Sequence, residues 1–165
     1  MSIQKSSGVV LALYPNRIGL AYALFNSEKQ LLEYGMNYVQ PVNNKKLMQR
    51  VRKYLDYYKP DVVLLRDVQD IQQSSKRSKK LLQKIKSEAD QQGLKLHQYT
   101  RSQIQQVFEV FEITTKYEIS KKLMEWYPEL RQYAYHKRKQ WMSEHHNTAI
   151  FDAASLAVVL WYLER

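Results

Sequence analysis

The segment GVVLALYPNRIGLAYALF, residues Gly8–Phe25, decides the fold class of this chain. Two apolar runs flank the short polar turn PNR, and apolar runs separated by a turn are typical of paired β-strands. The first run ends at Tyr14, directly before the turn. The segment therefore predicts that the sheet begins with two antiparallel strands.

The residues that follow extend this pattern. Residues 29–41 predict a third strand, which ends at Pro41. Apolar residues at helical spacing predict a helix over residues 43–58. Residues 61–67, DVVLLRD, form the short continuous apolar run that is typical of a buried parallel strand.

The second half of the chain alternates helices and strands. Residues 74–93 carry an apolar stripe among Lys and Arg, which predicts a basic amphipathic helix. Residues 94–99 predict another strand, and Thr100 or Ser102 caps the next helix. The nearly all-apolar residues 150–163 predict a buried helix. This order predicts an α/β fold with a mixed five-stranded sheet, three antiparallel strands and then parallel strands, flanked by helices.

Composition limits the class of protein. A chain of 165 residues with 44% hydrophobic and 25% charged residues predicts a single globular domain over residues 1–165. No apolar run reaches the roughly 20 residues that span a bilayer, and MSIQKSSG lacks the apolar core of a signal peptide. The absence of cysteine excludes disulfides and thiolate zinc sites. We expect a cytoplasmic protein with no membrane partner.

The charge indicates the kind of partner. Lys and Arg number 26 against 16 Asp and Glu, which gives a net charge of +10 and a pI near 9.6. Phosphate neutralisation dominates affinity for nucleic acids, so a basic chain with clustered cations among aromatic residues is typical of nucleic-acid binding. A basic protein without such a partner is the alternative.

The strand order also predicts where a ligand would bind. In open α/β sheets, ligands bind outside the carboxyl ends of the central strands. The first and fourth predicted strands end at Tyr14 and at Arg66 and Asp67. We therefore expect these three side chains beside one another.

Three passages carry a resemblance to a known family. They are VVLALYPNRIGLAYALF, KPDVVLLRDV and IFDAASLAVVL, and together with the order of elements they cover nearly all of the chain. The chain resembles the RNase H-like superfamily and, within it, the RuvC-type Holliday-junction resolvases. The resemblance implies nuclease ancestry, DNA rather than RNA as the partner, and a homodimer acting on a two-fold symmetric junction.

Position by position, the resemblance exposes a substitution of the catalytic carboxylates. The first-strand Asp of the family falls on Tyr14, or on Ala12 in a shifted register, its fourth-strand Glu falls on Arg66, and its final-helix Asp falls on Asp152. Family members hold two Mg²⁺ ions with carboxylates. Mg²⁺ or Mn²⁺ is therefore the implied cofactor, but we expect a degenerate site that binds none.

A displaced metal site is an alternative. Asp67 adjoins the vacated position, Asp70 follows it, and Glu144 precedes the last helix, so these carboxylates could form with Asp152 a displaced site that holds one metal ion. The catalytic groups would be Asp67, Glu144 and Asp152. Asp67 and Asp152 would then be the metal ligands. Structural roles compete with this interpretation: Asp67 could pair with Arg66, Asp70 could be a solvated turn residue, and Glu144 could support the helix start.

Asp152 needs a partner whichever interpretation holds. It lies within the apolar residues 150–163, and burying an unpaired charge is costly. It is either a residual metal ligand or the ion-pair partner of Arg66 or Lys139.

Two basic segments are candidate substrate-binding regions. In YHKRKQWMSEHHN, the cations Lys137, Arg138 and Lys139 could contact phosphates, and Trp141 could stack on a base, although a loop anchor is the favoured role for Trp141. The predicted helix over residues 74–93 carries the second set: Lys76, Arg77, Lys79, Lys80, Lys84 and Lys86. A solvated helix face is the alternative for this set.

These observations leave three hypotheses for the function. The first is a RuvC-like nucleic-acid-binding protein with a degenerate or altered metal site. The second is an active, metal-dependent, structure-selective endonuclease of the resolvase type. The third is a non-catalytic protein-interaction module on the same scaffold. Fold likeness alone does not decide among them.

Overall fold

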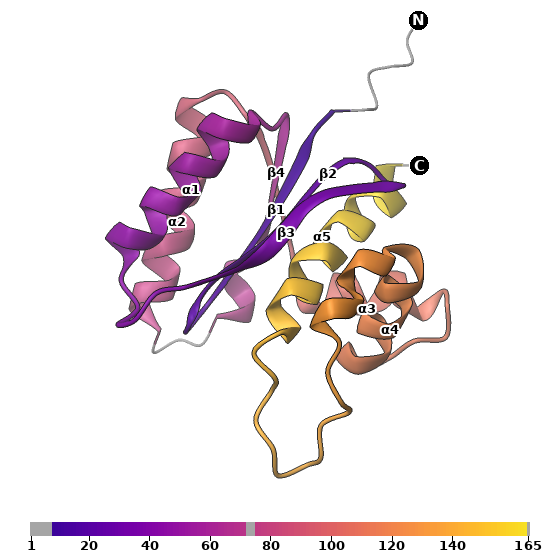
Figure 1. Ribbon diagram of the computed structural model, residues 1–165. Coiled ribbons are helices and arrows are strands. Elements are labelled where there is room, and N and C mark those ends of the chain that lie inside the picture. The colour runs from indigo at the N-terminus through magenta and orange to yellow at the C-terminus, as the bar shows by residue number, and fades with distance from the viewer. Residues whose placement is uncertain (1–7, 72–74, 165) are drawn as a thin grey trace, which may run out of the picture.

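The computed structural model describes residues 8–71 and 75–164, which form a five-stranded sheet with helices on both faces (Figure 1). Ser74, the expected first residue of the basic helix, and residues 1–7 of the MSIQKSSG segment lie outside the described residues. The elements are β1 (Val10–Asn16), β2 (Gly19–Ser27), β3 (Gln30–Tyr38), α1 (Asn44–Tyr58), β4 (Val62–Arg66), η2 (Val68–Asp70), α2 (Lys76–Gln91), β5 (Lys95–Tyr99), α3 (Arg101–Glu109), α4 (Lys116–Trp126), η3 (Pro128–Tyr133) and α5 (Thr148–Glu164).

The sheet confirms the predicted topology. Its strand order is β3-β2-β1-β4-β5, with β1–β2 and β2–β3 antiparallel and β1–β4 and β4–β5 parallel. In Figure 1, α1 and α2 cover one face, while α3, α4 and α5 lie on the other. This is the mixed α/β sheet, with three antiparallel strands and then parallel strands, that the order of elements predicts.

The turn between β1 and β2 is specified by two residues. The Asn16 side-chain Oδ1 accepts hydrogen bonds from the backbone N–H groups of Ile18 and Gly19, both at 3.0 Å. A Cβ on Gly19 would lie 1.9 Å from the Asn37 carbonyl oxygen, so only glycine allows β2 and β3 to approach this closely. The turn and the close strand contact together fix the antiparallel hairpin.

Helix starts also follow from the sequence. The Asn43 side chain accepts a hydrogen bond from the Lys46 N–H and caps α1, which then ends at Tyr58 as the apolar spacing predicts. Of the two predicted caps for α3, Thr100 is the one used, and it forms a capping box with Gln103. Such caps satisfy N–H groups that no helical carbonyl reaches.

The two sheet faces bury different helices because side chains alternate along a strand. On β1, Leu11 and Leu13 belong to the core beneath α1 and α2, whereas Ala12 and Tyr14 belong to the core beneath α5. Nearly every residue of α5 from Thr148 to Leu160 is buried, which confirms the predicted buried helix. Tyr14 is therefore directed toward α5.

No helix in the described part of the chain is both long enough and apolar enough to cross a membrane. The most apolar helix, α5, spans 17 residues and is packed against the sheet.

Candidate functional site

Tyr14 and Arg66 lie together at the carboxyl ends of β1 and β4, as the strand order predicts. The Arg66 guanidinium carbon is 4.4 Å from the centre of the Tyr14 ring, which is a cation–π contact. Arg66 also donates from Nη1 to the Pro15 carbonyl oxygen at 2.9 Å and from Nη2 to the Asp70 carbonyl oxygen at 3.5 Å. Its guanidinium thus fills the space where strands β1 and β4 end.

Asp152 projects from α5 into the same region and is only 4% exposed. Its Oδ2 lies 3.4 Å from the Lys116 Nζ, and its Oδ1 lies 4.0 Å from the Arg101 Nη1. Neither Arg66 nor Lys139, the partners expected from the sequence, pairs with it. The expectation was wrong because α3 and α4 both begin beside α5 and bring their first residues, Arg101 and Lys116, to the carboxylate.

Lys116 holds a second carboxylate. Its Nζ lies 3.0 Å from Glu144 Oε2, so one ammonium group joins Glu144 to Asp152. We call Tyr14, Arg66, Arg101, Lys116 and Asp152 the strand-end site. With Glu144 and Asp70 at its edge, cations from three residues face carboxylates from three.

The pKa shifts have identifiable physical causes. Burial raises the pKa of Asp152, although Lys116 opposes the rise, whereas the negative charge of Asp152 raises the pKa of Lys116 against the effect of burial. Burial and the Asp152 charge raise the pKa of Tyr14 to about 12. At neutral pH, Tyr14 is a neutral phenol and Lys116 is a cation.

The strand-end site does not fit a divalent metal ion. Mg²⁺ binds oxygen ligands, usually carboxylates, and the site offers one buried carboxylate that an ammonium group already contacts. Arg66 and Arg101 add positive charge that repels a cation. Among residues 8–71 and 75–164, no three His, Asp or Glu side chains are grouped so that they could hold a metal.

The carboxylates of the displaced metal site have separate structural contacts. Asp67 accepts a hydrogen bond from the Gln69 N–H at 2.9 Å and caps η2, rather than pairing with Arg66. Asp70 is not a solvated turn residue, because its Oδ2 accepts a 2.7 Å hydrogen bond from the Arg101 N–H. Glu144 shares Lys116 with Asp152, so Asp67, Glu144 and Asp152 are not brought together as one set of ligands.

The basic loop, residues 134–147, differs in character from the strand-end site. Figure 1 shows this orange segment extending away from the helices that surround it. Lys137, Arg138 and Lys139 are exposed. Trp141 is 78% exposed, so the favoured role as a loop anchor is wrong. The Lys139 Nζ lies 5.9 Å from the centre of the Trp141 ring, so a cation and a stacking surface are presented together.

The predicted cations of the second set lie along α2, whose first turn follows the carboxyl end of β4. Arg77 is directed to α1, where its Nη1 donates to Asn44 Oδ1 at 3.0 Å. The exposed members are Lys76, Lys80, Lys84 and Lys86. Only the start of this helix therefore adds positive charge near the strand ends.

Sequence reasoning missed Lys116 and Arg101, the two cations that contact Asp152. The pattern Thr115 to Glu118 is a capping box and marks the start of α4 at Lys116, so the helix boundary could have been found. No local pattern signals that this first residue contacts a side chain 36 positions away.

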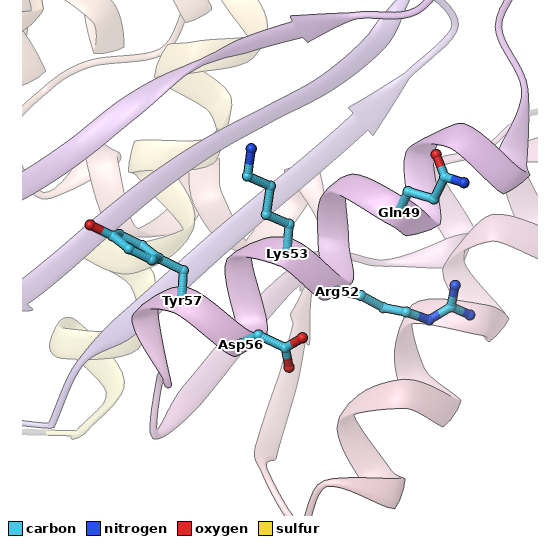
Figure 2. A pocket seen from close by; sticks show the side chains of 5 residues that line it. All are labelled: Gln49, Arg52, Lys53, Asp56 and Tyr57. Atoms are coloured by element: carbon cyan, nitrogen blue, oxygen red, sulfur yellow. The ribbon is translucent and has the colours of Figure 1, made fainter.

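A depression on α1 offers no comparable site. It has a volume of about 600 Å³ and is lined by Gln49, Arg52, Lys53, Asp56 and Tyr57. Figure 2 shows these side chains leaving one helix in different directions without converging. Its cation Arg52 is also paired, with Glu88 at 3.1 Å. The lining is an ordinary solvated helix face.

Comparison with known proteins supports the fold. No family model matches the sequence. No curated protein matches it either. Among solved structures, Thermus thermophilus RuvC in complex with Holliday junction substrate aligns with a TM-score of 0.66 at 17% identity, over 95% of each chain.

Two further structures agree. A second Thermus thermophilus RuvC structure gives a TM-score of 0.67 at 16% identity, over 94% of this chain and 95% of that chain. Fowlpox virus resolvase, in a complex with Holliday junction DNA, gives a TM-score of 0.55 at 18% identity, over 94% of this chain and 99% of the resolvase. The chain has the RNase H-like fold of the RuvC-type resolvases.

Proposed function

We propose that this chain is a RuvC-like DNA-binding protein whose strand-end site contacts the phosphate backbone without a metal ion. The observation that carries the proposal is the position of Lys116, whose Nζ lies between Asp152 Oδ2 at 3.4 Å and Glu144 Oε2 at 3.0 Å. A fixed ammonium group neutralises the carboxylates that would otherwise attract a divalent cation.

The surrounding charge supports a phosphate ligand. The basic loop brings the exposed cations Lys137 and Arg138 to a pocket that Lys116 and Glu144 also line. Phosphate contacts with such cations give most of the sequence-independent affinity for DNA. The solved structures that share this fold include two with Holliday junction DNA, which favours branched DNA over other nucleic acids.

A binding and cleavage panel tests this proposal. Single-stranded, duplex and four-way-junction DNA, with RNA counterparts, would be titrated with the protein in Mg²⁺, in Mn²⁺ and in chelator. We expect salt-sensitive binding that chelator leaves unchanged, without cleavage. Robust Mg²⁺-dependent cutting that Asp152→Asn abolishes would instead establish the endonuclease hypothesis.

A gain-of-binding series tests why the metal is excluded. The variant Tyr14→Asp with Arg66→Glu supplies two carboxylates but keeps the Lys116 ammonium group, and the addition of Lys116→Gln removes that group. By calorimetry, we expect Mn²⁺ binding in the triple variant and much weaker binding in the double variant. Equal Mn²⁺ affinity in both would show that Lys116 does not exclude the metal.

One feature favours a protein-interaction role as a second candidate. A groove of about 530 Å³ is lined by Phe111, Trp126 and Tyr162, which are each 38–42% exposed. Exposed aromatic residues of this kind mark interaction surfaces. Sedimentation of the wild type and of Trp126→Ser would test whether this groove joins two copies as a homodimer. DNA affinity in a monomer would leave the first proposal intact.

We also propose a cytoplasmic location for this activity. The chain has no cysteine, which suits a reducing compartment. Fractionation of cells that express the full chain tests this location.

A further inference from the structure

A second cavity adjoins the strand-end site, between α4, the basic loop and the start of α5. We call it the tyrosine pocket. It has a volume of about 260 Å³. Its lining residues are Thr115, Lys116, Tyr117, Tyr135, Lys137, Arg138, Glu144, His145 and Thr148. Sites for drug-sized ligands occupy roughly 300–1,000 Å³, so this pocket accepts one small planar group rather than a long ligand.

The side of the pocket formed by α5 carries a polar group that is weakly hydrogen-bonded. Thr148 is 2% exposed, and within the described part of the chain its Oγ1 forms no hydrogen bond of ordinary geometry. Burial raises the pKa of Tyr135, and an interaction with the Thr148 side chain opposes this rise, while the Tyr135 phenol donates to the Lys116 carbonyl oxygen at 3.4 Å. A buried hydroxyl with a weak hydrogen bond costs free energy, which a polar ligand group in the pocket beside it would reduce.

Aromatic rings form much of the remaining wall. The Tyr135 and His145 ring centres are 5.6 Å apart with an interplanar angle of 10°, and His146, which does not line the pocket, stacks on His145 at 4.2 Å. Tyr117 meets Tyr135 edge to face at 6.1 Å. Burial and the neighbouring histidines lower the pKa of His145, so its ring is neutral at pH 7. These surfaces suit a flat, uncharged aromatic group.

Positive charge lies at the mouth of the pocket. Lys137 and Arg138 both line it and are exposed. Neither forms an ion pair with a carboxylate in the described ranges. A ligand with a planar aromatic body and flanking negative charges would satisfy the rings, the hydroxyl and these cations together. A nucleotide within a DNA strand has these properties.

We propose that the tyrosine pocket binds the base of one unpaired DNA nucleotide, with the flanking phosphates on Lys137 and Arg138. This inference rests on the proposed DNA binding and specifies which DNA structure is preferred. A base inside a duplex is paired and stacked, and extracting it costs free energy, whereas a bulged or junction nucleotide is already free. The protein therefore prefers DNA that contains an unpaired nucleotide.

The test uses two duplexes that differ by one bulged nucleotide, each with 2-aminopurine at the same position and a distant anisotropy label. Anisotropy reports binding, and 2-aminopurine emission reports the environment of the base. We expect tighter binding of the bulged duplex and a change of emission that the fully paired duplex lacks. A matching bulged RNA duplex distinguishes recognition of DNA from recognition of any unpaired base.

Two variants and a control locate the effect. Tyr117→Leu removes an aromatic wall, and we expect it to reduce the preference for the bulged duplex by roughly tenfold, which is the effect of removing one stacking surface. Thr148→Val removes only the hydroxyl, and we expect it to reduce the same preference less. The control is Tyr57→Leu, which removes a 78% exposed tyrosine from α1 and should leave the preference unchanged.

The outcomes separate this inference from the proposed function. Three results would each overturn the pocket inference while leaving DNA binding intact: equal binding of both duplexes, unchanged 2-aminopurine emission, or full preference for the bulged duplex in Tyr117→Leu. Absence of binding to any DNA would overturn both. Equal preference for bulged RNA would overturn the assignment to DNA.

Discussion

The strand-end site and the basic loop are both rich in cations, but they differ in what those cations contact. In the strand-end site, Lys116 and Arg101 lie 3.4 and 4.0 Å from the buried Asp152. In the basic loop, Lys137 and Arg138 are exposed and have no carboxylate partner among the described residues. A phosphate must compete with Asp152 for Lys116 and Arg101. It meets no such competitor at Lys137 and Arg138.

This difference separates the roles of the two regions. Cations that are already paired with a carboxylate add little net attraction for a polyanion, but removing one leaves a buried charge without its partner. Exposed cations add little to stability and much to phosphate affinity. We therefore expect changes in the loop to have the larger effect on DNA binding and changes in the strand-end site to have the larger effect on folding stability.

The largest expected effect is on DNA affinity. Replacing Lys137, Arg138 and Lys139 together by Ala should weaken duplex binding about 100-fold near 0.15 M salt and reduce the salt slope by roughly 0.9 for each phosphate that the variant no longer neutralises. Anisotropy titrations across ~50 to 200 mM salt measure both quantities. The matched control replaces Lys84, Lys86 and Lys95, which carry the same total charge. An equal loss in the control would show that total charge, not the loop, governs binding.

The second effect is on stability. Lys116→Met should lower the free energy of unfolding by about 2 kcal/mol, less than for a fully buried pair because the Lys116 side chain is 31% exposed. Adding Asp152→Asn removes the unpaired charge and should recover much of the stability. Urea unfolding of the wild type, both single variants and the double variant measures the coupling. Additive effects in the double variant would contradict a direct interaction.

The third effect concerns Trp141 and sharpens the role of the loop. Trp141→Ala should weaken binding of single-stranded DNA roughly tenfold, because the variant has no stacking surface for a base at this position. Stability should change little, since the ring is 78% exposed. A large fall in the urea midpoint would instead restore the role of Trp141 as a loop anchor.

The fourth effect is a pH dependence that comes from Asp152. Burial raises its pKa above the ordinary value of 3.8, so the folded protein favours the protonated carboxyl. The stabilising contribution is fully present below pH 3.8 and is lost as pH rises through the higher folded-state pKa. Relative to Asp152→Asn, the wild type should therefore lose thermal stability as the pH rises through this window. Melting curves of both proteins at matched pH values measure the difference in melting temperature. A rise in the melting temperature of the wild type relative to Asp152→Asn with increasing pH would contradict this prediction.

The smallest effect tests the weakly hydrogen-bonded hydroxyl. Thr148→Val keeps the side-chain shape and removes an Oγ1 whose interaction with the Tyr135 phenol lacks ordinary hydrogen-bond geometry, so it should stabilise the free protein by up to about 1 kcal/mol. The shift of the urea midpoint measures this gain. Destabilisation would show that the hydroxyl is satisfied in solution.

The sequence by itself determined the framework and the placement of Tyr14 beside Arg66. Strand alternation, the Asn16 turn and the Asn43 and Thr100 caps are local patterns, each decided by residues a few positions apart. The order of these elements, together with the rules for open α/β sheets, predicts that the two side chains lie at neighbouring strand ends, and β1 and β4 are adjacent and parallel. Roles in binding or catalysis stay predictions for all the site residues.

Only the tertiary structure decided what surrounds Asp152 and where Trp141 lies. Asp152 and its partner Lys116 are 36 positions apart, and they meet because α4 packs against α5. A hydrophobic pattern predicts that both helices are buried, but not which first-turn side chain reaches which carboxylate. Trp141 is 78% exposed, and no local pattern in its loop signals whether the ring packs on the core or lies in solvent.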